Sequence, residues 1–266
     1  MSGFSSSLAR GFLCLLLPAV MLCLGGCASA PYTGRSQFII MDESEEMQLG
    51  LEASRQILAG EKTETGTARS LRVERIGRKI AQQAERPNFD WQFHTIVADE
   101  MNAFCLPGGR VFVYTGFLEL VGDNDAELAA IMGHEIAHAL ARHGAERYSQ
   151  ESVTGLGLSA AALATNIYSG SGYAGMAVQM GGTLAAKLGF LLPYSRLHES
   201  EADHIGVILA AKAGYDPRGA VSLWGKMAEL DAGKGVPFFL STHPLSRERQ
   251  EDLLKIMPEA LRYYNP

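Results

Sequence analysis

The sequence has little of several features that mark whole classes of protein. Its 266 residues include 4 Cys and 2 Trp, and 23 Lys and Arg stand against 29 Asp and Glu, giving a formal net charge of −6. The basic residues form no cluster, which argues against nucleic-acid binding. No internal repeat is visible, so no helical-repeat domain for binding partners is expected. A single globular domain is the organisation that these absences favour.

The N-terminal residues predict export. Arg10 supplies a positive charge, and residues 11–24 form an apolar run. Leu24-Gly25-Gly26-Cys27 resembles a lipobox, in which Cys27 becomes the lipid-modified N-terminus. Residues 1–26 are therefore predicted to be a lipoprotein signal peptide. The alternative is an ordinary signal peptide or an uncleaved anchor.

The predicted lipidation divides the rest of the chain. Residues 27–41 are expected to be a lipid tether, and residues 42–266 the main domain. Because Ala28 and not Asp follows the cysteine, the usual sorting rule of Gram-negative bacteria predicts the periplasmic side of the outer membrane. Cys105 is then the one thiol left to the main domain, so no internal disulfide is expected there.

The most informative stretch is His134-Glu135-Ile136-Ala137-His138. A helix advances about 100° per residue, so the two imidazoles lie one above the other and can bind one metal ion. Glu135 then lies beside them, where it can act as a base toward a water on that metal. The spacing is typical of zinc hydrolases. The alternative is two core or surface histidines spaced by accident.

The flanking residues predict the helix that this geometry requires. Asn124 and Glu127 have the spacing of a capping box, and Gly144 is a plausible end. Apolar residues recur at helical spacing between them: Leu128, Ile131, Met132, Ile136 and Leu140.

A third ligand must come from elsewhere, and the best candidate stretch begins at His198. Glu199 and Asp203 share one helical face, whereas Glu201 is rotated about 160° from Asp203. One carboxylate can bind zinc while its partner holds a ligand imidazole in the correct tautomer. A solvated acidic face is the alternative.

These stretches resemble a known family. ELAAIMGHEIAHALARH, YSRLHESEAD, STHPLSRERQ and NAFCLPGGRVFVYTGFL are similar to zinc metallopeptidases of the HtpX and CAAX prenyl endopeptidase type (peptidase family M48), in its periplasmic lipoprotein branch. The likeness runs from about Asp42 to about Leu254. It implies an α+β, mostly helical, zincin-like (gluzincin) domain with a small β-sheet before the zinc-binding helix.

The resemblance also assigns roles. It implies that His134, His138 and Glu199 bind one Zn²⁺ per chain, that Glu135 is the catalytic base, and that Asp203 holds a ligand imidazole. His243 lies in the matching stretch as well. It is expected to stabilise the oxyanion or to bind zinc as a latch in a resting form, and structural capping of its loop is the alternative.

Other residues are expected to lie outside the metal site. His143 is expected about 180° round the helix from His134, so it cannot share the metal. Residues 90–98 and 110–114 are predicted strands, and the second is expected to be an edge strand that pairs with substrate. The Gly-rich residues 149–192 are expected to form helices or a mobile lid, with membrane insertion as the alternative.

The sequence therefore predicts a zinc endopeptidase that hydrolyses unfolded or misassembled cell-envelope proteins. Its expected partners are polypeptide substrates, the membrane through a lipid anchor, and envelope assembly machinery. An alternative is a chaperone-like outer-membrane assembly factor whose metal site is structural or latent. A membrane-embedded protease and a structural lipoprotein are weaker alternatives.

Overall fold

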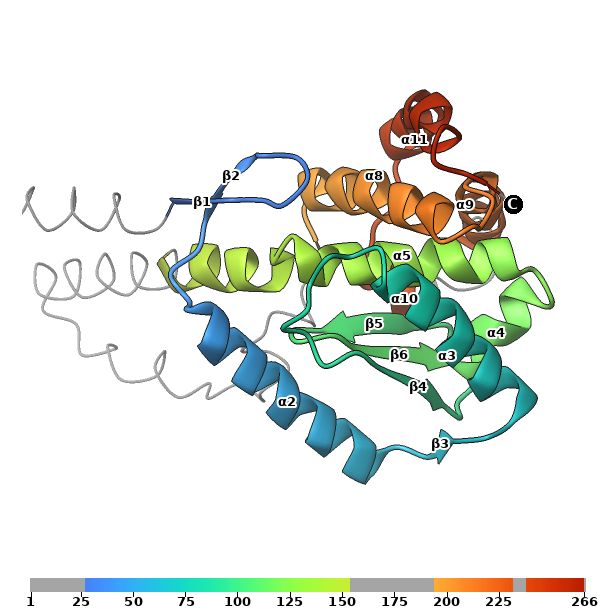
Figure 1. The fold of residues 1–266 in the computed structure, drawn as a ribbon, viewed down its shortest axis with the longest axis horizontal. Coiled ribbons are helices and arrows are strands. Elements are labelled where there is room, and N and C mark those ends of the chain that lie inside the picture. Colours follow the sequence, from blue (N-terminus) through green and yellow to red (C-terminus); the bar gives the residue numbers. More distant parts are fainter. Residues whose placement is uncertain (1–26, 154–193, 232–237, 266) are drawn as a thin grey trace, which may run out of the picture.

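The computed structural model describes residues 27–153, 194–231 and 238–265. Its helices and two sheets follow one another along the chain as Figure 1 shows. The elements before the central helix are β1 (Cys27–Ser29), β2 (Ser36–Phe38), α2 (Glu43–Gly60), β3 (Thr63–Glu64), α3 (Ala68–Ala81), β4 (Gln92–Ile96), β5 (Ala103–Leu106), β6 (Arg110–Tyr114) and α4 (Thr115–Val121). They are followed by α5 (Asp125–Leu140), α8 (Arg196–Lys212), α9 (Arg218–Asp231), α10 (Phe238–Thr242) and α11 (Arg247–Ala260).

The α+β, mostly helical fold predicted from the sequence is confirmed. Helix α5 begins where its cap predicts, because the Asn124 side chain accepts hydrogen bonds from the backbone N–H groups of Ala126 and Glu127. The Glu127 side chain binds Lys226 and Ser222 on α9 instead of completing a capping box. The start of α5 is thus also tied to α9.

The larger sheet has the strand order β3-β4-β6-β5. Strands β4 and β6 are parallel, and β5 is antiparallel to β6. The prediction that residues 110–114 form an edge strand is wrong, because β6 lies between β4 and β5. Alternation of side chains identifies a strand but not its neighbours, and the short strand β5 was not predicted. The edge strands of the sheet are β3 and β5.

Each face of this sheet packs against different helices. Ala103, Cys105, Val111 and Val113 lie in the main core with residues of α3 and α5. Leu106, Phe112 and Tyr114 point to the other face, where they pack against Ala53 of α2. Figure 1 shows α5 running along the sheet with β5 as the nearest strand. The helix that carries the HEIAH stretch is therefore held against the edge strand.

Helices α5 and α8 cross at a pair of glycines. A Cβ atom on Gly133 would lie 2.7 Å from the carbonyl oxygen of Gly206, and one on Gly206 would lie 2.7 Å from the backbone nitrogen of His134. Side chains essentially never approach so closely, so the two backbones touch only because both residues lack a side chain. This contact sets the distance between the residues of α8 and the histidines of α5.

The segment predicted to be a tether packs on the domain. Strands β1 and β2 form a hairpin, and Ile39 and Met41 after it are buried with Ala145. Residues 1–26 and most of residues 149–192 lie outside the described part of the chain, so the signal peptide and the lid or membrane segment stay predictions. Within the described ranges, no helix combines the length and apolar character needed to span a membrane.

Candidate metal centre

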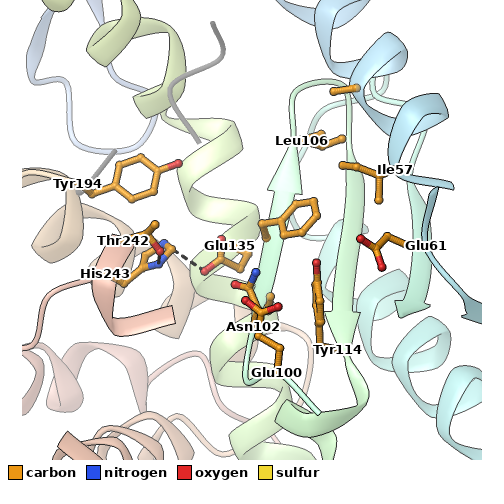
Figure 2. A pocket seen from close by; sticks show the side chains of 13 residues that line it. Ile57, Glu61, Glu100, Asn102, Leu106, Tyr114, Glu135, Tyr194, Thr242 and His243 are labelled. Atoms are coloured by element: carbon orange, nitrogen blue, oxygen red, sulfur yellow. Dashed lines mark hydrogen bonds and ion pairs between the residues drawn. The ribbon is translucent and has the colours of Figure 1, made fainter. Parts of the chain in front are cut away.

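Helix α5 places His134, Glu135 and His138 in the interior, each no more than 3% exposed. Glu135 faces His243, which follows α10, and its Oε1 atom lies 3.5 Å from His243 Nε2 (Figure 2). Both side chains line a cavity between α2, β5 and the α10 segment. Glu135 is thus the residue of the HEIAH stretch that can reach a molecule entering this cavity.

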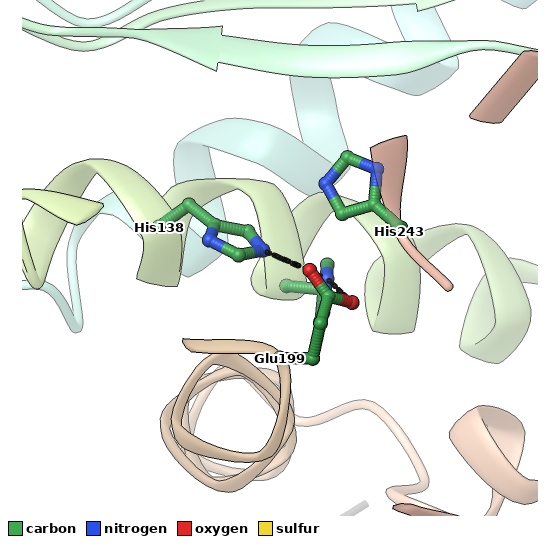
Figure 3. A group of neighbouring side chains, drawn as sticks. His138, Glu199 and His243 are labelled. Atoms are coloured by element: carbon green, nitrogen blue, oxygen red, sulfur yellow. Dashed lines mark hydrogen bonds and ion pairs between the residues drawn. The ribbon is translucent and has the colours of Figure 1, made fainter. Parts of the chain in front are cut away.

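The two histidines of α5 face Glu199 of α8. The Nε2 atoms of His134 and His138 lie 3.0 Å apart. Glu199 Oε1 lies 3.4 Å from His138 Nε2, and its Oε2 lies 3.6 Å from His134 Nε2 (Figure 3). The ligand atoms of these three residues and of His243 all lie within 4.8 Å of one another. The structure therefore brings together the three expected ligands and the expected latch residue.

The hydrogen bonds around two of these imidazoles set their tautomers. His243 Nδ1 lies 3.3 Å from the carbonyl oxygen of Phe239, which can only accept, so Nδ1 carries the proton. His134 Nδ1 lies 2.9 Å from Asp203 Oδ1, where a carboxylate has the same effect. His243 therefore presents an unprotonated Nε2 to the centre of the group, and in His134 the Nε2 atom is the one that faces the centre. Asp203 lies where the sequence predicted a partner for a ligand imidazole.

The third imidazole is set through two further residues. His138 Nδ1 lies 2.8 Å from His143 Nδ1, and His143 Nε2 lies 2.9 Å from Glu201 Oε2. Burial lowers the pKa of His143 to about 4, although the Glu201 carboxylate raises it, so this ring is neutral. Its Nε2–H donates to Glu201, and its Nδ1 accepts from His138. His138 is left with Nε2 free for a metal.

As the sequence predicted, His143 and Glu201 are not among the residues grouped for a metal, but the expected position of His143 about 180° round the helix is wrong. That expectation assumed that the helix continues past His138, but α5 ends at Leu140, and Arg142 has a φ of 54°. This left-handed residue turns the chain so that His143 comes back against His138. The contact depends on the end of α5 and on the left-handed conformation of Arg142, and no local sequence pattern predicts these two features.

Arg249 of α11 is a residue that the sequence did not single out. Its guanidinium lies 2.5 Å from Glu199 Oε2 and donates to both oxygens of Asp203 at 2.6 Å and 3.0 Å. It also stacks over Trp224 at 4.3 Å from the ring centre. Arg249 thus holds the ligand carboxylate and the carboxylate behind His134 in one position. Its location within STHPLSRERQ was the available signal.

An outer layer of charges surrounds His143. Arg35, in the β1–β2 loop, pairs with Glu146 at 2.6 Å and with Glu201 at 2.8 Å. Thr33 donates to the same Glu201 carboxylate. His198 contacts Glu146 at 3.1 Å, and its ring stacks on His143. The N-terminal hairpin therefore takes part in the network that orients His138.

The electrostatics of the centre favour a bound cation. Burial raises the pKa of Glu199, but His243 and Arg249 outweigh it and lower that pKa to about 2, so the carboxylate is ionised. Burial lowers the pKa of His138 and His243 well below the usual range, so both rings are neutral. Burial also raises the pKa of Glu135, to about 8. Burial lowers the pKa of His134, but Asp203 and Glu199 outweigh it and raise that pKa to about 9, so this ring would release a proton when a metal binds. The neutral His138 and His243 and the ionised Glu199 are already in the protonation states that zinc requires.

Several buried polar atoms of the group lack a hydrogen-bond partner among the described residues. Glu199 Oε1 and His243 Nε2 make no hydrogen bond within the described part of the chain. A buried polar atom without a partner is costly, and a metal ion would satisfy both. Imidazole nitrogens and one carboxylate oxygen are also the donor set of catalytic zinc sites. The residues present therefore fit a zinc ion.

Comparison with known proteins assigns the family. The sequence model of peptidase family M48 matches residues 67–257. The chain belongs to peptidase family M48. The chain is also 31% identical to mitochondrial metalloendopeptidase OMA1 of Saccharomyces cerevisiae over 271 residues, which cover 91% of this chain and 75% of that protein. The prediction of an enzyme of the metallopeptidase class is confirmed by this membership.

Further relatives come from a second fungus and from a bacterium. OMA1 of Schizosaccharomyces pombe is 37% identical over 197 residues, which cover 72% of this chain and 54% of that protein. The β-barrel assembly-enhancing protease of Escherichia coli (strain K12) is 29% identical over 232 residues, which cover 84% and 46%. The chain spans about half the length of these two relatives.

The predicted localisation is contradicted by these relatives. Six of them, at 31% to 38% identity and from fungi, a plant and animals, are named as mitochondrial enzymes. The two bacterial proteases match at 28% and 29%. The periplasmic side of a bacterial outer membrane was inferred from Leu24-Gly25-Gly26-Cys27 and Ala28, and so short a pattern has little specificity.

Proposed function

We propose that the protein is a zinc-dependent endopeptidase of the zincin type that hydrolyses peptide bonds in unfolded or misassembled proteins. The observation that carries the proposal is the buried group of His134, His138, Glu199 and His243 beside Glu135. Membership of family M48 and the metalloendopeptidase names of the relatives support it. A role in protein quality control rests on the broad substrate class alone.

In this proposal His134, His138 and Glu199 hold the metal. Zinc bound there would polarise the scissile carbonyl and make a coordinated water more acidic. Asp203 and the His143–Glu201 pair keep the two α5 imidazoles in the tautomers that bind it. Arg249 keeps Glu199 in place and ionised.

Glu135 performs the proton transfers. Its carboxylate takes a proton from the attacking water and then delivers that proton to the leaving amine. Burial raises the pKa of Glu135 to about 8, and a cation held by the neighbouring ligands would lower it, so that the ionised carboxylate can accept the proton. The low exposure of the side chain also keeps bulk water from competing for the proton.

Strand β5 orients the substrate. It is an edge strand of the sheet, and it packs against α5 next to Glu135. An extended peptide that pairs with this edge would receive backbone hydrogen bonds that do not depend on its sequence. Its scissile bond would then run past Glu135 and His243.

The test is metal analysis and casein cleavage on wild type and Glu135→Gln. The amide keeps the shape of the side chain but cannot accept the proton, so hydrolysis should fall about 10²–10⁴-fold while zinc content stays unchanged. Glu119→Gln, a change at a 69% exposed side chain, should leave both unchanged. Equal turnover of wild type and Glu135→Gln would rule out the mechanism, and a lack of cleavage by both would favour the assembly-factor alternative.

His243 has two possible roles within this function. As a fourth ligand it would keep the enzyme latent, so His243→Ala should raise basal proteolysis or self-cleavage while zinc is retained. If His243 is the oxyanion stabiliser, its removal should lower turnover about 10²–10³-fold. Its unprotonated Nε2 atom faces Glu135 and the ligand group, which suits the fourth-ligand role, whereas the oxyanion role requires a proton on Nε2. Unaltered activity and zinc content would leave a loop-capping role.

Cys27 remains a predicted site of lipidation. Its strand β1 pairs with β2, so a lipid on this residue would attach next to the hairpin that contacts Glu201. Palmitate labelling of wild type and Cys27→Ser tests the proposal. Label that persists in the variant would eliminate the lipid anchor and with it the division at residues 26 and 41.

A further inference from the structure

The cavity beside Glu135 extends well beyond the metal centre. It has a volume of about 300 Å³ and runs from Glu135 and His243 across strand β5 to the face of the sheet that α2 covers (Figure 2). The side chains that line it are Ala53, Ile57, Glu61, Glu100, Asn102, Ala103, Phe104, Leu106, Tyr114, Glu135, Tyr194, Thr242 and His243. A side chain of a peptide bound along β5 could enter this space.

The middle of the cavity is apolar. Ile57 of α2 and Phe104 and Leu106 of the edge strand face it, and Phe104 stacks on Phe112 at a ring distance of 4.9 Å. The stacking fixes the position of the Phe104 ring, so this wall is rigid. An aliphatic stem would lose water on both sides when it lies between α2 and β5.

One part of the cavity is acidic. Figure 2 shows Glu61 and Glu100 on either side of the Tyr114 ring. Neither carboxylate forms an ion pair with another described residue, and the described lining contains no Lys or Arg. Burial raises the pKa of Tyr114 to about 12, and the negative charges of Glu100 and Glu61 add to that shift. The phenol therefore lies in a negative potential that nothing in the described lining neutralises.

Another part of the cavity reaches the reacting centre. Glu135 is 2% exposed, and its Oε1 atom lies at the cavity without a hydrogen-bond partner in the described ranges. The cavity therefore connects the acidic residues to a buried carboxylate oxygen of Glu135 that lacks a hydrogen-bond partner in the described ranges.

We propose that this cavity is a specificity pocket for a Lys or Arg side chain of the peptide substrate. The methylene stem lies on Ile57 and Phe104, and the cation lies between Glu61 and Glu100 against the face of Tyr114. Long basic side chains bury their stems on apolar surface and keep the charged end in polar surroundings. An aromatic face adds a cation–π attraction. The inference rests on the proposed peptidase function, whose substrate class it narrows.

Binding can be tested without hydrolysis. Fluorescently labelled decapeptides of Ala, Ser and Gly with one central Lys, norleucine or Glu are titrated into zinc-loaded Glu135→Gln protein, and anisotropy is measured. Norleucine has the same stem as Lys but no charge. The Lys peptide should bind about fivefold tighter than the norleucine peptide, and the difference should shrink in high salt. Equal affinities of the two peptides would overturn the inference.

Substitutions test which carboxylates bind the cation of the Lys peptide. Glu61→Gln combined with Glu100→Gln, in the same background, should bring the Lys peptide to the affinity of the norleucine peptide. Glu45→Gln on the same helix α2, also an exposed carboxylate, is the matched control and should preserve the difference. A preference for Lys that survives the double change would place the cation elsewhere and overturn the assignment. Both changes lie at exposed positions, so folding is not at risk.

Hydrolysis separates this inference from the function on which it rests. Wild type should cleave the Lys peptide with a higher kcat/KM than the norleucine peptide, by the same factor as in binding. Cleavage of all three peptides at one rate would overturn the pocket and leave the peptidase standing. A Lys preference in binding without any cleavage would instead support the pocket and contradict the peptidase.

Discussion

His138 Nδ1 lies 2.8 Å from His143 Nδ1, and the far nitrogen of His143 lies 2.9 Å from Glu201. Helix α8 therefore acts on both histidines of α5, directly on His134 through Asp203 and indirectly on His138 through Glu201. The same helix supplies Glu199. One helix thus provides the ligand carboxylate and both carboxylates that orient the ligand imidazoles.

This arrangement predicts the effect of removing His143. His143→Ala should lower zinc affinity about 10–100-fold, because His138 loses the acceptor that fixes its tautomer. His143→Gln should retain more of the affinity, since an amide can accept from His138 and donate to Glu201. His204→Ala, at a histidine 38% exposed, is the control and should bind zinc normally. Competition with a fluorescent chelator measures the affinity, and an unchanged value in His143→Ala would contradict the role.

The glycine crossing predicts a second effect. Gly206→Ala should destabilise the protein by about 1–3 kcal/mol, because the new methyl must push α8 away from the backbone of His134. It should also weaken zinc binding, since Glu199 moves with α8. Gly225→Ala in α9 is the matched control, because no atom lies within 4 Å of its added Cβ. That change should be neutral or stabilise by up to about 1 kcal/mol in urea unfolding. Equal effects of the two changes would show that the crossing is not tight.

The part of the site that follows helical pitch could be predicted from the sequence. His134, Glu135 and His138 are fixed relative to one another by the helix alone, and the start of that helix at Asn124 is equally local. The contact of His143 with His138 depends on the left-handed Arg142, and the contact of Arg249 with Glu199 joins two separate helices. Such contacts depend on tertiary packing, which periodicity does not encode.

The strand order of the sheet also could not be predicted from local sequence. Alternating side chains located β4 and β6, but nothing local distinguishes a central strand from an edge strand. The turn at residues 107–109 was also recognised, yet it joins β6 to the short β5 and not to β4. The parallel pairing of β4 with β6 follows from long-range contacts with α3 and α5.

The ion pairs of Arg35 predict a third effect. Arg35→Ala should lower the free energy of unfolding by about 2–4 kcal/mol, because it leaves Glu146 and Glu201 buried without their cation. The control is Arg69→Ala, which removes an exposed pair with Glu64 and should cost at most about 1 kcal/mol. Urea unfolding of the chelator-treated proteins measures both. A loss in Arg35→Ala no larger than in the control would mean that the hairpin only rests on the domain.

Acid should remove that stabilisation. Burial raises the pKa of Glu146, but the hydrogen bonds from Arg35, His198 and Gln37 outweigh it and hold that pKa well below its usual 4.5. A lowered folded pKa means that the stability is present above pH 4.5 and is lost as pH falls through the folded value. The difference between wild type and Arg35→Ala should therefore be largest at neutral pH and shrink below pH 4.5. A difference that is constant from neutral pH to pH 3 would contradict the ion pair, pH 3 being about one unit below the ordinary range of Glu.

Removal of the metal should lower thermal stability. At a free zinc concentration about 100 times the Kd, binding adds about 3 kcal/mol, which corresponds to roughly 5–10 °C in Tm for a domain of this size. EDTA should produce this drop in wild type but not in His138→Ala, whose site is already broken. Differential scanning calorimetry measures it. An equal response of both proteins would show that EDTA acts somewhere other than the ligand group.

Because Thr33 and Arg35 bind Glu201, the smallest stable fragment must include the N-terminal hairpin. The family pattern starts at residue 67, so a fragment cut at that boundary would retain the HEIAH helix. It would still lose the hairpin, helix α2 and one wall of the cavity. A protease that clips the chain between the hairpin and α2 would have a similar effect, because it would release a charge that the metal centre depends on through His143. The proposed catalytic unit thus begins upstream of the segment that the family pattern matches.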